Sequence, residues 1–137
     1  MTVQKKHINP PDLFSTRRLG FTHVVTSSPG TTVYISGQTA WDADRKIVGG
    51  TDLRLQAQQS FRNLRTALEA AGATSADVVF VRLYVVDYRP EYAAVLSPLL
   101  EEFFAGGPLP GSTWVGVQSL AVPDFVIEIE ATAVIAA

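Results

Sequence analysis

The sequence Ile127-Glu128-Ile129-Glu130-Ala131-Thr132-Ala133-Val134-Ile135 decides the fold of this 137-residue chain. Successive side chains of a β-strand point to opposite faces of a sheet. In this stretch every odd-numbered residue is apolar, whereas the even-numbered residues include two glutamates. We therefore expect residues 125–135 to form a strand that turns one face toward a hydrophobic core and the other toward a more polar environment.

A second strand with the same two-faced pattern is expected over residues 77–87, which are rich in β-branched and aromatic residues. A further strand is expected over residues 112–118. The aliphatic face of the second strand would carry Val79, Val81, Leu83 and Val85. Its opposite face would carry Val78, Phe80, Arg82, Tyr84 and Val86.

Two earlier strands, over residues 23–26 and 32–36, flank a Pro29-Gly30 turn signal. Two β-rich runs separated by a short turn predict a hairpin, so we expect these two strands to pair with each other. The first twenty residues are polar and include the stiff segment Asn9-Pro10-Pro11-Asp12. We interpret residues 1–19 as an N-terminal arm rather than as part of the core.

The clearest helix is expected over residues 51–71, where apolar residues recur every three or four positions and form one stripe. Asp52 or its predecessor can cap the start of this helix, and Gly72 suits the left-handed position after its end. A second helix is expected within residues 91–105, with Pro98 inside it. Proline removes a helical hydrogen bond, so this helix either kinks at Pro98 or restarts there with a new cap.

The predicted order of elements is β-β-α-β-α-β-β, and no internal repeat or long linker divides it. A chain of 137 residues, 47% of them hydrophobic, can bury one core without disulfides or structural metals. We therefore expect a single α+β domain over residues 1–137, in which two helices pack on one face of a mixed sheet.

The face of the sheet turned away from the helices is predicted to be too apolar for contact with water, although it also carries charges. Two helices cannot cover both sides of the sheet, and contiguous exposed apolar patches mark interfaces. We therefore expect an obligate homo-oligomer whose subunits cover this face and gather its polar groups in clefts between them. Its apolar members would be Phe80, Tyr84, Trp114, Val126 and Val134, and its charged members Arg82, Glu128 and Glu130.

The charge balance and the missing residue types exclude several classes of function. Thirteen acidic and eleven basic residues give a net charge of −2, which offers no positive field for nucleic acid or an anionic membrane. Cysteine is absent, which removes thiol nucleophiles, and two histidines without paired spacing do not indicate a metal site. The sequence shows no signal-peptide pattern and no apolar run long enough to cross a bilayer, so we expect a cytoplasmic protein.

Glu128 is the leading candidate for chemistry. A carboxylate within a largely buried strand loses hydration unless it is paired, and burial raises its pKa toward values useful for proton transfer. The structural alternative is an ion pair with Arg82 across the sheet. Arg82 is in turn a candidate anion-binding group, with pairing to Glu128 or Glu130 as its alternative. His23 is a candidate acid–base group, with a structural hydrogen bond as its alternative.

Two further segments supply candidate binding groups. Ser36-Gly37-Gln38 follows a strand, and its glycine lets backbone amides approach a ligand unless the segment only terminates the strand. Ser112-Thr113-Trp114 offers hydroxyl groups and an aromatic plane, but no nearby base. Packing in an interface is the alternative role of Trp114.

Four segments of the chain are typical of one family: Tyr34-Ile35-Ser36-Gly37-Gln38, Ile47-Val48-Gly49-Gly50, Ala70-Ala71-Gly72-Ala73 and Ile127-Glu128-Ile129-Glu130-Ala131. In this order they resemble the RidA (YjgF) family. The resemblance covers nearly the whole chain from Gly20. It implies a chorismate-mutase-like α+β fold, assembled as a homotrimer with small-molecule sites in clefts between subunits. It also implies cofactor-free hydrolysis of reactive enamines and imines, such as 2-aminoacrylate, to a 2-oxo acid and ammonia.

In active members of this family an arginine grips the substrate carboxylate, while a glutamate and a backbone carbonyl orient the attacking water. The resemblance places the glutamate at Glu128 and the carbonyl at Thr113. It places the pocket lining at Ser36 and Gly37. The arginine does not carry over, because Gly111-Ser112-Thr113 stands where the family has Arg-Ser/Ala-Thr.

The N-terminal segment Gly20-Phe21-Thr22-His23 is similar to that of arginine-lacking relatives, which places Phe21 and His23 near the site. Loss of a bidentate arginine removes charge-assisted hydrogen bonds to a substrate carboxylate, which argues against deamination of small 2-imino acids. Glycine at position 111 is also expected to widen the pocket. His23, Trp114 or a re-aimed Arg82 are the candidates to replace the arginine.

Three functions follow from these observations. The first is a RidA-like hydrolase of an imine, enamine or related small molecule, with water oriented by Glu128. The second is a non-catalytic trimer that binds or senses a small molecule and has lost the chemistry. The third is a ribonuclease, a label attached to some relatives, against which the acidic balance argues.

Overall fold

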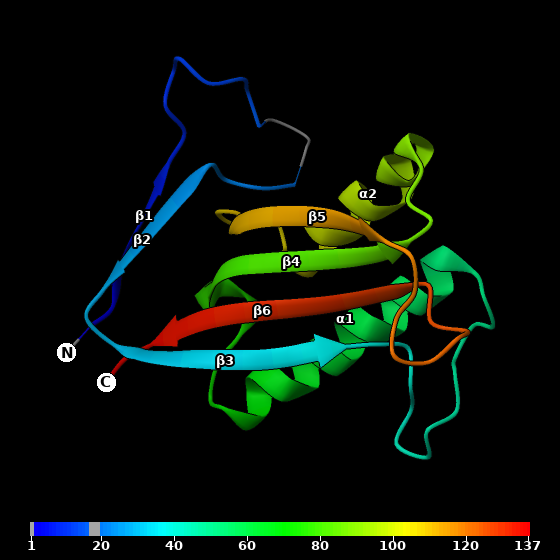
Figure 1. Ribbon diagram of the computed structural model, residues 1–137. Helices are drawn as coiled ribbons and strands as arrows, with labels where there is room; N and C mark the ends of the chain where they lie inside the picture. Colours follow the sequence, from blue (N-terminus) through cyan, green and yellow to red (C-terminus); the bar gives the residue numbers. More distant parts are fainter. Residues whose placement is uncertain (1, 17–19) are drawn as a thin grey trace.

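The computed structural model describes residues 2–16 and 20–137 of the chain. Its main body is a mixed four-stranded sheet with two helices on one face, which confirms the predicted α+β architecture. Figure 1 looks onto the face of this sheet that neither helix covers. The elements are β1 (Gln4–Ile8), β2 (Val24–Ser28), β3 (Thr31–Gln38), α1 (Leu53–Ala70), η1 (Ser75–Asp77), β4 (Val78–Val86), η2 (Pro90–Tyr92), α2 (Ala93–Phe103), β5 (Gly111–Val117) and β6 (Ile127–Ile135).

Strand β6 lies inside the sheet, whose strand order is β3-β6-β4-β5. It pairs antiparallel with both β3 and β4, whereas β4 and β5 run parallel. The predicted alternation along β6 is confirmed, because Ile127, Ile129 and Ala133 are fully buried in the core. Glu128 and Glu130 lie on the opposite face and are half-buried.

The start of β4 departs from the predicted alternation. The register of β4 against β6 shifts between Val78 and Phe80, so that Val78 pairs with Ala133 and Phe80 with Thr132. Such a bulge inserts one extra residue and reverses the facing of the residues before it. Val78 is therefore the buried core residue, and the prediction that Val79 fills this place is wrong.

Both predicted ends of the first helix are confirmed in α1. The carboxylate of Asp52 accepts a hydrogen bond from the backbone N–H of Leu55 at 2.9 Å and so caps the start of the helix. Gly72 lies just past the end with a φ of 76°, in the left-handed region that glycine enters without strain.

Helix α2 continues through Pro98, so the alternative that a second helix restarts there is wrong. A proline inside a helix leaves the carbonyl four residues earlier, here that of Ala94, without its usual donor. Both residues are exposed, and a carbonyl that faces solvent can bind water instead.

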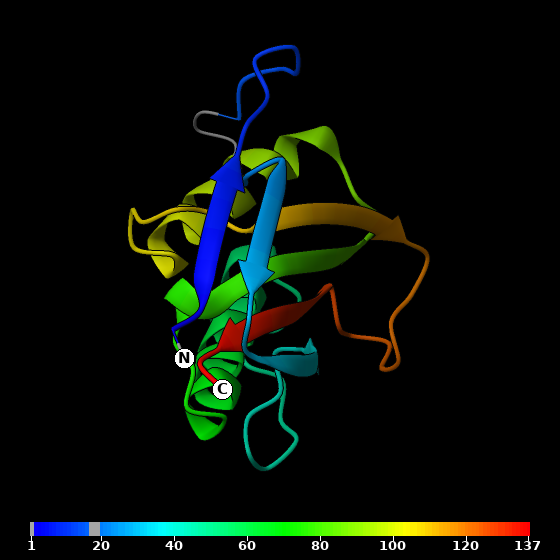
Figure 2. The same ribbon diagram turned by 90° about the vertical axis from the view of Figure 1, so that its left-hand side faces the viewer.

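The predicted hairpin between the two earliest strands is wrong. Strand β2 pairs with β1, which forms within the predicted N-terminal arm, and β3 pairs with β6 instead. β6 offers β3 a partner with a fully apolar face, whereas β2 ends in three polar residues and stays largely exposed. The β1–β2 pair stands at the end of the main sheet where β3 begins and β6 ends (Figures 1 and 2).

The side chain of Gln56 joins α1 to the loop that leads into β6. It is fully buried, donates to the carbonyls of Gly50 (2.6 Å) and Asp124 (2.8 Å), and accepts from the N–H of Val126 (2.9 Å). A buried amide such as that of Gln56 is costly to leave unpaired. This amide therefore fixes the segment that delivers β6, and with it Glu128, to the sheet.

Replacing Gln56 by Leu should lower the free energy of unfolding by about 2–4 kcal/mol, because three backbone groups lose their hydrogen-bond partner. Urea unfolding followed by circular dichroism measures the change. Gln58→Leu, at a half-buried position of the same helix, is the matched control and should change stability little. Equal stability of the two variants would contradict the assigned role of Gln56.

Candidate functional site

The open face of the sheet brings together the charged residues that the sequence singled out. Directly opposite residues on neighbouring strands project from the same face. The register places Arg82 opposite Glu130 and Tyr84 opposite Glu128, and it places Thr113 beside Arg82 on the next strand. Glu128, Glu130 and Arg82 therefore share one face, as predicted.

Arg82 forms an ion pair with Glu130 rather than with Glu128. Its Nη1 donates to Glu130 Oε1 at 2.8 Å, and the hydroxyl of Tyr84 donates to the same oxygen. These hydrogen bonds, the one from Tyr84 foremost, lower the pKa of the Glu130 carboxyl below its ordinary value. The guanidinium of Arg82 also lies 5.3 Å from the centre of the Phe80 ring. Arg82 is thus held by a carboxylate and an aromatic ring of its own chain.

Glu128 lies against the backbone of Gly37. The register of β3 against β6 shifts between Ile35 and Gln38, and a Cβ atom added at Gly37 would overlap Glu128 Oε2. Burial, followed by the negative charge of Glu130, raises the pKa of the Glu128 carboxyl. Within the described residues, no donor forms a hydrogen bond with this side chain, so its oxygens can bind water or a ligand.

The space in which a side chain at position 111 would begin lies against a neighbouring ring. A Cβ atom added there would lie 3.0 Å from Cδ2 and 3.4 Å from Cε2 of Phe80, which pairs with Gly111 across β4 and β5. The expectation that glycine widens the pocket at this point is therefore wrong, because the Phe80 ring fills the space.

Phe21 and His23 lie near the Gly111 end of the face. Thr22, between them, fixes this segment to the residues before β5. Its N–H donates to the carbonyl of Pro110 at 2.8 Å, and its hydroxyl donates to the carbonyl of Leu109. The Nε2 of His23 lies 2.8 Å from the carbonyl oxygen of Phe14, and its ring contacts those of Phe14 and Phe21. Within this chain, the contacts of His23 are those of a structural residue, which is the alternative to an acid–base role.

Ser112 and Trp114 lie on the other side of the sheet. Trp114 pairs with the core residue Leu83 and packs against the hydrophobic core, with its ring 6.4 Å from that of Tyr88. Its indole N–H donates to the hydroxyl of Ser112 at 3.1 Å. The prediction that Trp114 belongs to the open face is therefore wrong. Thr113 faces the open side and is exposed.

Ser36 is exposed at the β3 edge of the open face, and its carbonyl accepts a hydrogen bond from the side chain of Gln38 at 3.0 Å. A hollow of about 270 Å³ opens beside it on the same face. Phe80, Tyr34 and Thr132 belong to its lining and were absent from the predicted site. The lining also includes Val79, Arg82 and Glu130.

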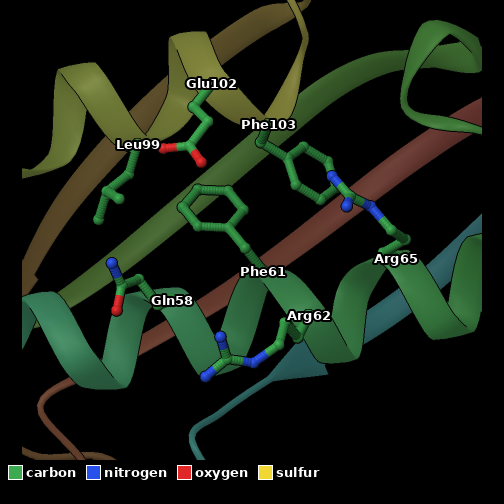
Figure 3. Close-up of a pocket in the computed structure, with 7 residues that line it drawn as sticks. All are labelled: Gln58, Phe61, Arg62, Arg65, Leu99, Glu102 and Phe103. Atoms are coloured by element: carbon green, nitrogen blue, oxygen red, sulfur yellow. The ribbon is translucent and has the colours of Figure 1, made fainter.

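A second hollow, of about 360 Å³, lies between α1 and α2, on the side of the molecule away from the open face. Figure 3 shows side chains of both helices directed into it, with Phe61 and Phe103 forming an apolar floor. Arg65 lies 5.1 Å from the Phe103 ring. This hollow contains none of the predicted site residues, so the open face is the better candidate for the functional site.

Comparison with known proteins identifies the family. A family model described as Endoribonuclease L-PSP matches residues 16–135. The Rid-family protein YyfB of Yersinia pestis, described as of unknown function, superposes with a TM-score of 0.93 and 42% identity over 96% of this chain and 98% of its own. The chain belongs to the Rid (YjgF) family. The predicted family and its chorismate-mutase-like α+β fold are thereby confirmed.

Two further relatives of this Rid protein carry functional descriptions. A 2-iminobutanoate/2-iminopropanoate deaminase of Dermatophagoides farinae is 34% identical over 106 residues, which cover 77% of this chain and 80% of the relative. The structure of TdcF from E. coli with bound serine matches with a TM-score of 0.67 and 27% identity, over 78% of this chain and 83% of TdcF.

Residues 2–16 and 20–137 contain no cluster of three or more histidine, cysteine or acidic side chains that could hold a metal ion. In the same part of the Rid protein no helix is both long and apolar enough to span a membrane.

Replacing Glu130 by Gln should lower the pKa of Glu128. The substitution removes the negative charge that helps to raise this pKa, and it frees the positive charge of Arg82. Carboxyl-detected NMR titration measures the change, with Glu69→Gln on the exposed side of α1 as the matched control. An unchanged or higher Glu128 pKa in the Glu130 variant would contradict this arrangement of charges.

Proposed function

We propose that this Rid protein hydrolyses the C=N bond of a reactive imine, or of the enamine that tautomerises to it. The observation that carries the proposal is the Glu128 carboxylate, which is half-buried, has a raised pKa and is bound by no donor among the described residues. The similarity to an imine deaminase at 34% identity supports the same reaction type.

The reaction needs a water molecule and a group that accepts its proton. The water oxygen would attack the carbon of the protonated imine while Glu128 takes one water proton, and the π electrons of the C=N bond would neutralise the nitrogen. Glu128 would return its proton to the nitrogen of the resulting carbinolamine. The C–N bond then breaks, ammonia or an amine leaves, and the hydroxyl loses its proton to give a carbonyl compound. The backbone carbonyl of Thr113, whose side chain lies on the same face, is a candidate second acceptor for the water. These steps require no cofactor and no metal, so we propose none.

We also propose that the protein acts as a homotrimer, with this face covered by other copies. Tyr34 is 82% exposed in the single chain, beside Phe80 and the hollow of the open face. Large aromatic residues at such exposure are typical of interfaces. The site would then lie between subunits, where burial raises the pKa of Glu128 further.

The oligomer is tested by sedimentation of the purified protein at micromolar concentration, for which we expect a trimer. Tyr34→Arg should weaken the assembly, because it places a charge in the proposed interface. Leu55→Arg is the matched control, since Leu55 is 46% exposed and lies on α1. A wild-type monomer at this concentration, or a Tyr34 variant that assembles as well as the control, would contradict the proposal.

The hydrolase is tested with a panel that contains 2-iminopropanoate, generated in situ, and a cyclic imine such as 1-pyrroline. Glu128→Gln should lower kcat/KM for the imine that is hydrolysed by about 10²–10⁴-fold, as expected for loss of a proton acceptor. Glu69→Gln should leave it unchanged. An unchanged rate in the Glu128 variant would rule out the role assigned to this residue.

The alternative function is a non-catalytic trimer that binds or senses a small molecule. It is favoured by one observation: Gly111 brings no side chain to the face, and Arg82 is already paired with Glu130. A substrate carboxylate therefore lacks a free guanidinium from these positions. Binding of small ligands without turnover of any imine in the panel would support this alternative over the hydrolase.

A further inference from the structure

The hollow between α1 and α2 has charged side chains on its rim that are not paired with each other. Helix α1 contributes Arg62 and Arg65, and α2 contributes Glu102. Within residues 2–16 and 20–137, neither arginine forms an ion pair with a carboxylate, and the Glu102 carboxylate accepts no hydrogen bond. By contrast, the guanidinium of Arg82 on the open face is paired with Glu130. The rim of the hollow between the helices therefore keeps charges of both signs for a ligand.

Two aromatic rings form the floor between these charges. The rings of Phe61 and Phe103 lie with their centres 4.9 Å apart and their planes tilted by 33°. Both residues belong to the hydrophobic core, so this floor is apolar and fixed in place. In Figure 3 the Phe61 ring lies between Glu102 and Arg62, and the Phe103 ring lies between Glu102 and Arg65. A ligand that reaches from the carboxylate to a guanidinium must therefore cross an apolar surface.

Both guanidinium groups are oriented by contacts within the chain. The Nε of Arg62 donates to the side-chain oxygen of Gln59 at 3.1 Å, which leaves its two terminal nitrogens for other acceptors. The guanidinium of Arg65 lies 5.1 Å from the centre of the Phe103 ring. A guanidinium binds a carboxylate through two parallel hydrogen bonds, and a side chain that is already oriented loses less freedom when it does so.

We propose that this hollow binds a small zwitterion whose carboxylate and cationic group lie at opposite ends of a flat apolar body. The carboxylate would bind the guanidinium groups of Arg62 and Arg65, the cationic group would bind Glu102, and the body would lie on Phe61 and Phe103. The volume of about 360 Å³ is within the range of small-molecule sites. The inference does not depend on the proposed hydrolase function. The hollow lies away from the open face, so it stays accessible if other copies cover that face.

Ligands with a single charge match this rim less well. A simple carboxylate would meet the like charge of Glu102, and a simple amine would meet the like charges of Arg62 and Arg65. A neutral apolar compound would gain nothing from any of the three. A zwitterion of the proposed shape places each of its charges beside the opposite one, so the rim favours this class over the others.

The test compares the binding of three probes that share one ring and nearly the same length. 4-(Aminomethyl)benzoate carries both charges, 4-methylbenzoate carries only the negative one and 4-methylbenzylamine only the positive one. In NMR titrations, 4-(aminomethyl)benzoate should bind the wild-type protein at least threefold more tightly than either other probe, a modest factor because exposed ion pairs contribute little. The largest shifts should occur at amides of α1 and α2 around the hollow.

Variants of the rim separate the contributions of the two charges. Glu102→Gln should weaken binding of 4-(aminomethyl)benzoate at least twofold, as expected for an exposed ion pair, and should not weaken that of 4-methylbenzoate. The double variant Arg62→Gln/Arg65→Gln should weaken binding of both carboxylate probes and not that of 4-methylbenzylamine. Glu101→Gln and Arg54→Gln are the matched controls, because they remove the same charges at exposed positions of the same helices outside the hollow.

The substituted side chains are all exposed, so the variants are expected to fold. Equal binding of the three probes by the wild-type protein would overturn the inference, as would no binding of 4-(aminomethyl)benzoate. Shifts confined to the open face would also overturn it, because the zwitterion would then bind elsewhere. A Glu102 variant that binds 4-(aminomethyl)benzoate as tightly as its Glu101 control would remove the basis for the assigned charge contact.

Discussion

The structure depends on the pairing of β6 with a neighbouring strand along each of its two edges. This strand is hydrogen-bonded along both edges, to β3 and β4, so it cannot shift its register without breaking two ladders. A shift by one residue would exchange the faces and expel Ile127 and Ile129 from the core. The burial of these aliphatic side chains under the helices therefore determines that Glu128 and Glu130 project from the opposite face. The hydrophobic core thus orients the carboxylates from the opposite side of the sheet.

The sequence was sufficient wherever a property depends on local periodicity. The alternation in β6, the apolar stripe of α1, the Asp52 cap and the left-handed Gly72 each follow from side-chain spacing or from one residue's conformational preference, and each is found in the structure. Non-local features could not be predicted in this way. The bulge after Val78 depends on the partner strand, and β3 pairs with β6 because a larger apolar surface competes with the nearby β2. Pairing partners of this kind leave no periodic signal.

The same distinction between local pattern and strand pairing applies to the residues of the candidate site. Alternation alone places Glu128 and Arg82 on one face, but it does not tell which glutamate Arg82 binds; the cross-strand register decides for Glu130. Trp114 was misplaced because β5 carries too short a pattern to fix its facing, and only its pairing with Leu83 shows that it belongs to the core side. The contact of Phe80 with Gly111 could not be predicted from the sequence, since the two residues meet only because β4 pairs with β5. A glycine in the sequence therefore does not imply an empty space at that position in the fold.

The contact between Phe80 and Gly111 also restricts the order in which this surface can diverge. A side chain at 111 would crowd the Phe80 ring, which would have to shift, whereas a smaller residue at 80 is compatible with glycine at 111. A lineage that exchanges one arrangement for the other is therefore expected to change position 80 first, and the intermediate would carry neither the ring nor a new side chain. The intermediate, with a small residue at 80 and glycine at 111, would contact a ligand less than either arrangement does. Exchange between the two arrangements is therefore expected to be slow, and positions 80 and 111 should vary together among relatives.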